Sequence, residues 1–195
     1  MPPGQFLTEK FPVLHEGQIP EFDKTNWDFR LFGLVEKEVT LDFNEFSRLP
    51  MDSVKADFHC VTTWSRYDNP WEGPLARTIA GLARPRPEAR FVLVHCDLGY
   101  TTNLPMEDFL REDVIFAMKW EGKDLTPEHG YPLRLVVPRL YAWKSAKWVR
   151  GVEFLAGNVR GFWESRGYHN NGDPWREERY SSQEPDEVFN TGGYS

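Results

Sequence analysis

The sequence predicts an α+β fold, in which a β-rich mixed core carries only short helices. Most of the patterned segments alternate apolar and polar residues or are runs of β-branched apolar residues, as strands are. The stretches with helical character are short, and prolines or glycines interrupt them. With 195 residues, the chain is long enough for one domain with a sizeable core.

The N-terminal residues 1–25 are expected to form an extended arm. Four prolines prevent a helix in this stretch: Pro2, Pro3, Pro12 and Pro20. The segment WDFRLFG, residues 27–33, alternates large apolar side chains with Asp28 and Arg30, and this pattern predicts a half-buried strand. The segment VTLDF, residues 39–43, continues the β character.

A short helix is predicted after Asp42. Asp42 and Glu45 have the spacing of a capping box, in which each side chain binds the backbone N–H of the other residue. We expect the helix to run through Phe46 and to end at Pro50.

The next predicted elements are a strand and a second helix. The strand is VKADFHCV, residues 54–61, and it leads to Cys60. The helix is PLARTIAGLA, residues 74–83, and we expect Gly81 and the following RPRP sequence to close it.

The rest of the domain is predicted to be mostly strands. The segment RFVLVHC, residues 90–96, is a β-branched apolar run of the kind found in buried strands. A loop with a helical turn is expected over residues 99–110, and a hairpin with a glycine-containing turn over residues 114–125. Two more strands are expected at residues 132–137 and 147–155.

From residue 156 onward the composition changes, because aliphatic residues thin out while glycine, arginine, glutamate and aromatic residues dominate. This segment contains more aromatic residues than a typical disordered tail does: Phe162, Trp163, Tyr168, Trp175 and Tyr180. We therefore expect residues 156–195 to wrap irregularly around the domain of residues 26–155 as part of it. The chain is expected to be loose after about Ser181.

Charge and composition exclude several classes of partner. The net charge of −7 argues against a nucleic acid or an anionic membrane surface as the main partner. No apolar run approaches the roughly 18 residues that a membrane span needs. The N-terminal sequence shows neither a signal-peptide pattern nor a twin-arginine pair, so we expect a cytoplasmic protein.

The chain has 2 cysteines, and each follows a histidine at the end of an apolar, strand-like run. The pairs His59-Cys60 and His95-Cys96 together suggest a Cys₂His₂ zinc site, but adjacent residues on a strand point to opposite faces, and the usual zinc-ligand spacings are absent. A Cys60–Cys96 disulfide is disfavoured in a cytoplasm. We interpret Cys96 as a small buried thiol. Cys60 precedes a threonine-rich loop, where binding sites are commonly built.

A basic, hydroxyl-bearing cluster follows about seventy residues after Cys60. Its members are His129, Arg134, Lys144, Ser145 and Lys147. Arginine binds phosphate as a planar fork and lysine as a point charge, whereas a thiolate binds a soft or high-valent metal. A ligand with a metal at one end and a phosphate at the other would suit both features. The alternative is that Arg134 lies on a solvated strand face and that the lysines are ordinary surface residues.

Four long, irregular strings carry a resemblance to a known family: HCVTTWS, GYTTNLP, PEHGYPLRLVVP and WKSAKWVRG. At these residues the chain resembles the sulfite oxidase superfamily of oxidoreductase molybdopterin-binding domains, and in particular its small, stand-alone members. The resemblance runs from about Phe11 to Tyr180. It implies the catalytic-domain fold of that superfamily and a molybdenum-molybdopterin cofactor, or its tungsten analogue. It also implies that Cys60 is the single protein thiolate on the metal.

The resemblance further implies a set of cofactor-binding residues. The stretch that binds the pterin and its phosphate in the family corresponds here to His129, Arg134, Lys144, Ser145 and Lys147. Further pterin contacts are implied at His15, His59, Thr62, His95 and Asn103. For Asn103 the alternative is an ordinary turn residue, since asparagine favours turns for its own hydrogen bonds.

The chain departs from the best-known sulfite oxidases, which hold their dianionic substrate with several arginines. Near Cys60 it offers only Arg66, and no segment of these 195 residues is expected to form the haem or immunoglobulin-like domain of those enzymes. Its cysteine motif is closer to that of bacterial protein-methionine-sulfoxide reductase catalytic subunits, although their twin-arginine signal is absent. Trp64, Tyr67 and Trp71 are expected either to line a substrate pocket or to belong to the core.

The implied function is oxygen-atom transfer with a two-electron change at the metal, acting on a small S- or N-oxide or a sulfite-like compound. A separate, unidentified redox partner would exchange the electrons, because no electron-transfer site is visible in the chain. The alternative from another class is a non-enzymatic module that binds or carries the cofactor or another phosphorylated ligand. Turnover of substrate at the metal distinguishes the two.

Overall fold

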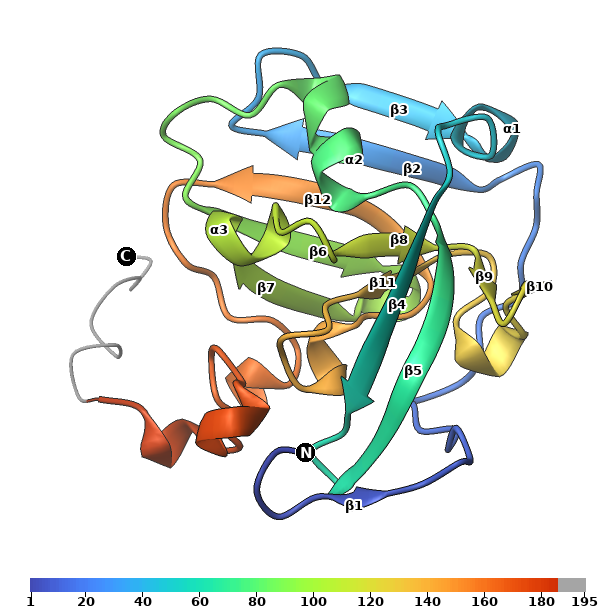
Figure 1. Cartoon of the computed structure of the whole chain (residues 1–195). Helices are drawn as coiled ribbons and strands as arrows, with labels where there is room; N and C mark the ends of the chain where they lie inside the picture. The colour runs from blue at the N-terminus through green and yellow to red at the C-terminus, as the bar shows by residue number, and fades with distance from the viewer. Residues whose placement is uncertain (186–195) are drawn as a thin grey trace.

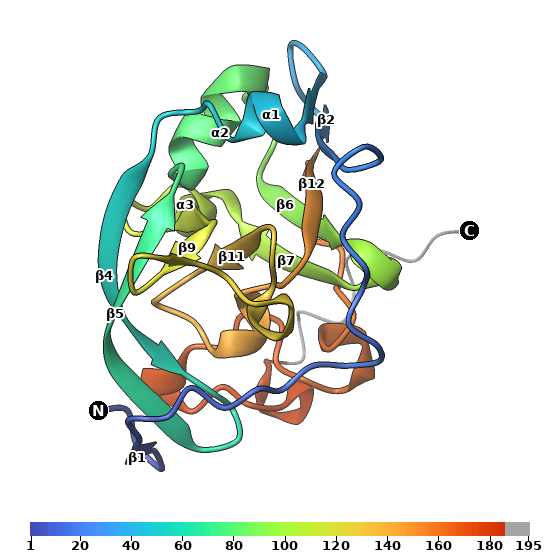
Figure 2. The same ribbon diagram turned by 90° about the vertical axis from the view of Figure 1, so that its right-hand side faces the viewer.

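In the computed structural model, which describes residues 1–185, two β-sheets face each other and the helices cover one end (Figures 1 and 2). The larger sheet has the strand order β3-β2-β12-β6-β7. Its strands are β3 (Val39–Asp42), β2 (Asp28–Gly33), β12 (Val149–Leu155), β6 (Phe91–Cys96) and β7 (Thr101–Pro105).

The second sheet is built on the long β4–β5 hairpin, which Figure 2 shows on the opposite side of the molecule from β12. Its order is β1-β5-β9-β10, and β4 pairs with β5 as well. These strands are β1 (Phe6–Leu7), β4 (Asp52–His59), β5 (Trp64–Gly73), β9 (Lys119–Trp120) and β10 (Lys123–Asp124). A separate antiparallel pair is formed by β8 (Ile115–Ala117) and β11 (Arg134–Val136).

The three helices are short: α1 (Phe43–Phe46), α2 (Ala76–Ala83) and α3 (Met106–Phe109). The predicted capping box is present in α1, because the Asp42 carboxylate accepts from the N–H of Glu45 and the Glu45 carboxylate from the N–H of Asp42. The prediction that Gly81 closes α2 is wrong. Gly81 lies inside the helix, which ends at Arg84 in the left-handed conformation.

The alternating pattern of β2 places its apolar residues in the core as predicted. Phe29 and Leu31 are fully buried, while Arg30 points away from the core. The parallel neighbour β12 can approach β2 closely because Gly151 has no side chain. A Cβ atom at Gly151 would lie 2.6 Å from the carbonyl oxygen of Arg30.

Two hydrophobic clusters result from this arrangement. The larger cluster lies between the β2-β12-β6 sheet and the helices, and it includes Phe46, Ile79 and Cys96. The smaller cluster lies along the β4–β5 hairpin, and it includes Phe58, Cys60 and Trp71. The α+β class with short helices is therefore confirmed.

Beyond β12, the chain continues as turns and short 3-10 segments that pack back onto the domain. Phe162 donates its N–H to the Thr101 carbonyl, and Gly172 accepts from the N–H of Tyr141. The predicted loosening after Ser181 falls largely on residues outside the described part, which ends at residue 185. Within that part, no helix has the length and apolar character needed to cross a membrane.

Candidate cofactor and metal site

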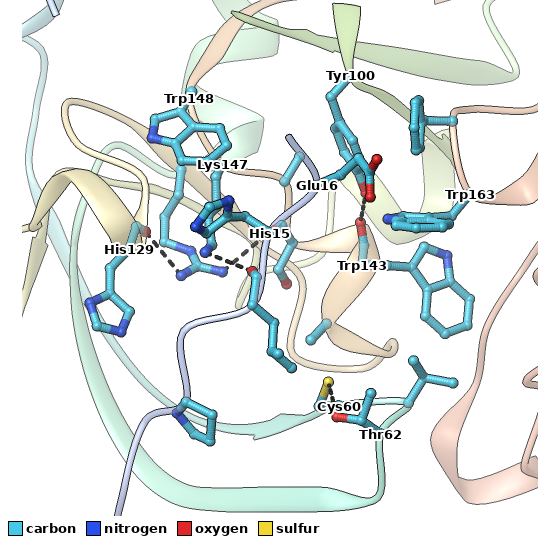
Figure 3. A pocket seen from close by; sticks show the side chains of 18 of the residues that line it. His15, Glu16, Cys60, Thr62, Tyr100, His129, Trp143, Lys147, Trp148 and Trp163 are labelled. Atoms are coloured by element: carbon cyan, nitrogen blue, oxygen red, sulfur yellow. Dashed lines mark hydrogen bonds between the residues drawn. The ribbon is translucent and has the colours of Figure 1, made fainter. Parts of the chain in front are cut away.

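A cavity of about 440 Å³ lies between the two sheets, and it brings together segments that are far apart in sequence. Figure 3 shows Cys60 and Thr62 at one side, with Lys147, His15 and His129 across the cavity from them. Aromatic side chains form the remaining wall, including Tyr100, Trp143 and Trp163.

Cys60 occupies the base of the hairpin loop between β4 and β5. Its N–H donates to the carbonyl of Trp64 (2.9 Å), and its carbonyl accepts from the N–H of Thr63 (3.0 Å). The Sγ atom lies 3.1 Å from the Thr62 hydroxyl. Burial raises the pKa of the Cys60 thiol, while the Thr62 hydrogen bond and the positive charge of Arg179 act in the opposite direction. A metal cation at Sγ would favour the thiolate further.

Arg134 and Lys147 form the basic side of the cavity. Arg134, on β11, is 2% exposed, and within residues 1–185 its guanidinium donates only to the carbonyls of His129 and Ser145, both at 3.1 Å. Its Nε atom is buried and has no hydrogen-bond partner. Among the described residues, neither Arg134 nor Lys147 forms an ion pair with a carboxylate.

Burial lowers the pKa of both cations. Desolvation brings the pKa of Arg134 to about 9 and that of Lys147 to about 7, with the charge of Arg134 also acting on Lys147. Two desolvated cations without an anion beside them are costly to the fold, and a bound anion such as phosphate would offset this cost.

The N-terminal arm crosses the cavity and uses backbone carbonyls to hold its basic side. Lys147 donates to the carbonyls of Leu14 (2.9 Å) and Glu128 (2.5 Å). The Phe11 ring stacks on His129 with centroids 4.8 Å apart, and the Phe11 carbonyl lies 3.3 Å from His129 Nε2. His15 lies edge-on to the Trp148 ring, with centroids 5.7 Å apart.

Seven of the eleven predicted site residues line this one cavity: His15, Cys60, Thr62, His129, Arg134, Ser145 and Lys147. Ser145 joins the cavity wall to the sheet, because its hydroxyl accepts from the N–H of Val137 at 2.9 Å. The fold thus brings these seven residues together around one cavity. That they bind a cofactor stays a prediction.

The other four predicted residues do not line the cavity. Lys144 is buried in the protein interior, where its Nζ lies 2.7 Å from the Glu164 carboxylate and donates to Asn103. Asn103 is engaged there as well, so neither side chain reaches the cavity. The partner Glu164 belongs to the C-terminal wrap, 20 residues away, and local sequence gave no sign of it.

The histidines of the two His-Cys pairs also point elsewhere. His59 is buried behind Cys60 and its Nδ1 lies 2.8 Å from the Ser65 hydroxyl. His95 lies on the sheet surface, where its Nε2 is 2.9 Å from the Glu153 carboxylate. The expected alternation along a strand explains both placements, because each histidine faces away from the neighbouring cysteine.

The aromatic wall was only partly predicted. Trp64 lines the cavity, whereas Trp71 is fully buried in the smaller core and Tyr67 is not part of the lining. Arg66 lies outside the cavity too, since it pairs with Glu121 at 2.6 Å. Sequence reasoning missed the rings that supply most of the wall: Tyr100, Trp143, Trp148, Phe162, Trp163 and Tyr168. Their only sequence signal was the high share of aromatic residues, 15% of the chain.

The residues present fit a cofactor that carries its own metal ligands and an anionic group. Within the described chain, no group of three or more His, Cys, Asp or Glu side chains is placed to hold a metal ion. A metal at Cys60 would therefore need its remaining donors from a bound cofactor. Across the cavity, the buried Nε of Arg134 without a partner in the described chain, and Lys147, which forms no ion pair there, are the residues that would hold the anionic group.

Comparison with known proteins identifies similar chains along most of the sequence. Residues 16–163 match the family described as the oxidoreductase molybdopterin binding domain. The oxidoreductase YuiH of Bacillus subtilis is 48% identical over 182 residues, which cover 93% of this chain and 92% of YuiH.

Two larger proteins share part of their length with this chain. The catalytic subunit MsrP of the Campylobacter jejuni protein-methionine-sulfoxide reductase is 30% identical, over 83% of this chain and 59% of MsrP. The solved structure of the sulfane dehydrogenase SoxCD from Paracoccus pantotrophus superposes with a TM-score of 0.66 at 24% identity. That match covers 72% of this chain and 41% of the SoxCD chain, and it shows a shared fold.

Proposed function

The chain belongs to the family of oxidoreductase molybdopterin binding domains, and from that premise we propose that it transfers an oxygen atom at a molybdenum held by Cys60. The predicted family and the molybdenum-molybdopterin cofactor are confirmed by the comparisons. The metal ligand, the substrate and the direction of reaction are the content of the proposal.

One observation carries the proposal: Cys60 lies on one side of the cavity, and the buried Arg134 and half-buried Lys147, which form no ion pair within the described chain, lie on the other. Cys60 supplies a thiolate, and Arg134 with Lys147 supplies a desolvated anion site. A soft ligand and an anion site at the two ends match a cofactor with a metal at one end and a phosphate at the other.

In this arrangement each residue has a physical task. Cys60 binds the metal, Arg134 and Lys147 bind the phosphate, and the arm residues Phe11 and Leu14 cover the basic side and exclude water from it. When bound, the molybdenum cofactor supplies the two-electron chemistry that oxygen-atom transfer needs. The protein fixes its orientation and the electrostatics around it.

The cavity favours a neutral oxide over the sulfite dianion. Among the described residues that line it, Arg134 is the single arginine and belongs to the basic side, while Glu16 contributes negative charge to the wall and Asp97 is paired with Arg150. Rings such as Trp143 and Trp163 offer apolar surface to the carbon frame of a substrate. We therefore propose a small S- or N-oxide as the substrate class.

Reduction of such an oxide consumes two electrons and two protons. The S–O or N–O bond breaks, the sulfide or amine is released, and the oxygen leaves as water. A separate redox partner that supplies the electrons and a cytoplasmic location are further parts of the proposal. The name of the Campylobacter relative makes a sulfoxide the first substrate to test.

Steady-state assays with artificial dyes test the proposal on protein purified from a molybdate-supplied host. We expect reduced dye to support turnover of methyl sulfoxides and N-oxides at a higher kcat/KM than oxidised dye supports for sulfite. Efficient sulfite oxidation with inert sulfoxides and N-oxides would overturn the substrate class. Bound molybdenum and pterin without turnover of any of these compounds would favour a cofactor-carrying module instead.

A further inference from the structure

Two side chains donate hydrogen bonds to the loop that carries Cys60. One lies before the residues of the family match and the other lies after them. The match covers residues 16–163, whereas the two side chains belong to Gln5 and Arg179. Their targets are the backbone carbonyls of Cys60 and of the residue after it. Neither side chain lines the cavity.

Gln5 holds Cys60 itself. It is 8% exposed, and its Nε2 donates to the Cys60 carbonyl at 3.0 Å. The next residue continues the contact, because Phe6 in β1 donates its N–H to the carbonyl of Thr63 at 2.8 Å. The N-terminal arm is thereby fixed to both ends of the Cys60–Thr63 loop.

Arg179 holds the middle of the loop from the C-terminal wrap. Its Nη1 donates to the carbonyl of Val61 at 2.5 Å, and its guanidinium lies over the Tyr141 ring, 5.0 Å from the centroid. The side chain is 13% exposed, and the one ion pair that it forms within the described chain, with Glu177, is long at 3.9 Å. The positive charge of Arg179 acts on Cys60, where it lowers the pKa of the thiol against the larger effect of desolvation.

The loop needs such support because it contains a strained residue. Thr63 has a φ of 77°, in the left-handed region that β-branched residues rarely adopt. Without the outer hydrogen bonds, relaxation at Thr63 would change the backbone angles of the loop and turn the Cys60 side chain. Groups that orient a metal ligand are as necessary to a metal site as the ligand itself.

We propose that Gln5 and Arg179 are positioning residues for Cys60, and that the charge of Arg179 also raises the reduction potential of the metal bound there. The proposal rests on the proposed Cys60–molybdenum bond. A positive charge close to the metal stabilises its more electron-rich, reduced state, so that removal of the charge lowers the midpoint potential. The two residues separate the effects, because Gln5 contributes a hydrogen bond without a charge.

Three variants test the proposal in the loaded enzyme: Arg179→Gln, Arg179→Lys and Gln5→Met. Redox titration followed by the molybdenum(V) EPR signal measures the potential, and hydrogen exchange at the Thr63 amide measures the order of the loop. Arg176→Gln is the matched control, because Arg176 lies in the same segment with a side chain 73% exposed.

Arg179→Gln is expected to lower the midpoint potential and to speed exchange at Thr63 by roughly tenfold or more, as the loss of a hydrogen bond from a charged donor predicts. Arg179→Lys should keep the midpoint potential, because it retains the positive charge. Exchange at the Thr63 amide should still be faster, because lysine lacks the planar guanidinium that holds the loop. Gln5→Met should also exchange faster at an unchanged potential, with an altered EPR spectrum. The control should change neither quantity.

If Arg179→Gln changes neither hydrogen exchange at Thr63 nor the midpoint potential, the proposal is overturned. If exchange becomes faster at an unchanged midpoint potential, the electrostatic part of the proposal is overturned. If Arg179→Gln does not fold, the other two variants decide, since unchanged exchange and EPR spectra in both would also overturn it. Failure of the proposed function has a different signature: the molybdenum(V) signal of the wild type would be missing, or would survive Cys60→Ser.

Discussion

The two cysteines occupy equivalent places in two hairpins and yet face different surroundings. Cys60 donates its N–H to the carbonyl of Trp64 at the base of the β4–β5 loop, and Cys96 donates to that of Tyr100 at the base of the β6–β7 loop, both at 2.9 Å. Cys60 lines the cavity, whereas Cys96 is buried in the larger core, where desolvation raises the pKa of its thiol well above the usual value.

The difference comes from the sheet and not from the local sequence. The strand before Cys96, β6, lies between β12 and β7 in the larger sheet, and although the β6–β7 loop reaches the cavity through Asp97, Leu98 and Tyr100, Cys96 itself packs in the larger core. The hairpin of Cys60 belongs to the other sheet, and its loop opens on the space between the sheets. Lys144 and Lys147 repeat this contrast three residues apart, with one in the interior beside Glu164 and the other in the cavity.

The largest effect is expected from Cys60→Ser. Serine keeps the volume of the side chain but is a poor donor for a soft metal, so the variant should fold and lack competent molybdenum. Elemental analysis with pterin fluorescence measures this, and the thermal unfolding midpoint checks the fold. Normal metal content with full oxygen-transfer activity would show that Cys60 is not the ligand.

Lys144→Met tests whether Lys144 belongs to the interior. Removal of one member of a buried ion pair leaves Glu164 uncompensated, and the expected loss of stability is about 3–5 kcal/mol. Urea unfolding of the cofactor-free protein measures it, with Lys147→Met as the control that should not lose stability. If Lys144→Met loses pterin at unchanged stability, Lys144 contributes to phosphate binding as the sequence predicted.

Lys147→Met should weaken cofactor binding and remove its pH dependence. Desolvation and Arg134 lower the pKa of Lys147 to about 7, while Glu128 and Cys60 act in the opposite direction. A phosphate binds the protonated form, so cofactor retention should fall as the pH rises above about 7 in the wild type. The phosphate contact is worth on the order of 1.5–3 kcal/mol.

The titration of Lys147 should also affect the stability of the cofactor-free protein, but stability should change with pH in the direction opposite to cofactor retention. The pKa of Lys147 in the folded state lies below the usual lysine value of 10.5, so the unfolded chain binds more protons between about pH 7 and pH 10.5. Stability should therefore rise with pH across this window in the wild type. A pterin retention that is flat with pH, in wild type and Lys147→Met alike, would contradict the assignment.

The smallest effect is expected from Cys96→Ala. A small buried thiol replaced by alanine leaves a minor cavity, and the expected cost is about 1 kcal/mol of stability with unchanged molybdenum content. Chemical denaturation and elemental analysis measure the two quantities. A loss of molybdenum as large as in Cys60→Ser would remove the distinction between the two cysteines.

The sequence predicted the elements whose patterns are local. The alternation of β2 and the capping box of α1 needed only their own residues, and both are present. The strand β5 was missed because Asp68, Asn69 and Pro70 are turn formers, and Asn69 and Pro70 stay in the strand because they pair with Ala56 and Lys55 of β4. The strand β7 was missed for a similar reason, since its sequence ends in a proline.

The site was predictable where the family motifs are contiguous and unpredictable where partners come from afar. Arg134 and Lys147 were placed by their motif, but the direction of Lys144 depends on Glu164 in the wrap. Gln5 and Arg179 carry no motif, and only the fold brings them to the Cys60 loop.

The walls of the cavity have a consequence for how the protein is made. They are contributed by residues from Phe11 to Tyr168, so the ribosome must finish nearly the whole chain before the cavity exists. The first strand, β1, waits likewise for β5, which is synthesised more than fifty residues later. Such long-range contacts can form only after most of the chain has been synthesised. The cavity is therefore complete only when the N-terminal arm that carries Leu14 and the C-terminal wrap that carries Tyr168 have both packed onto the domain.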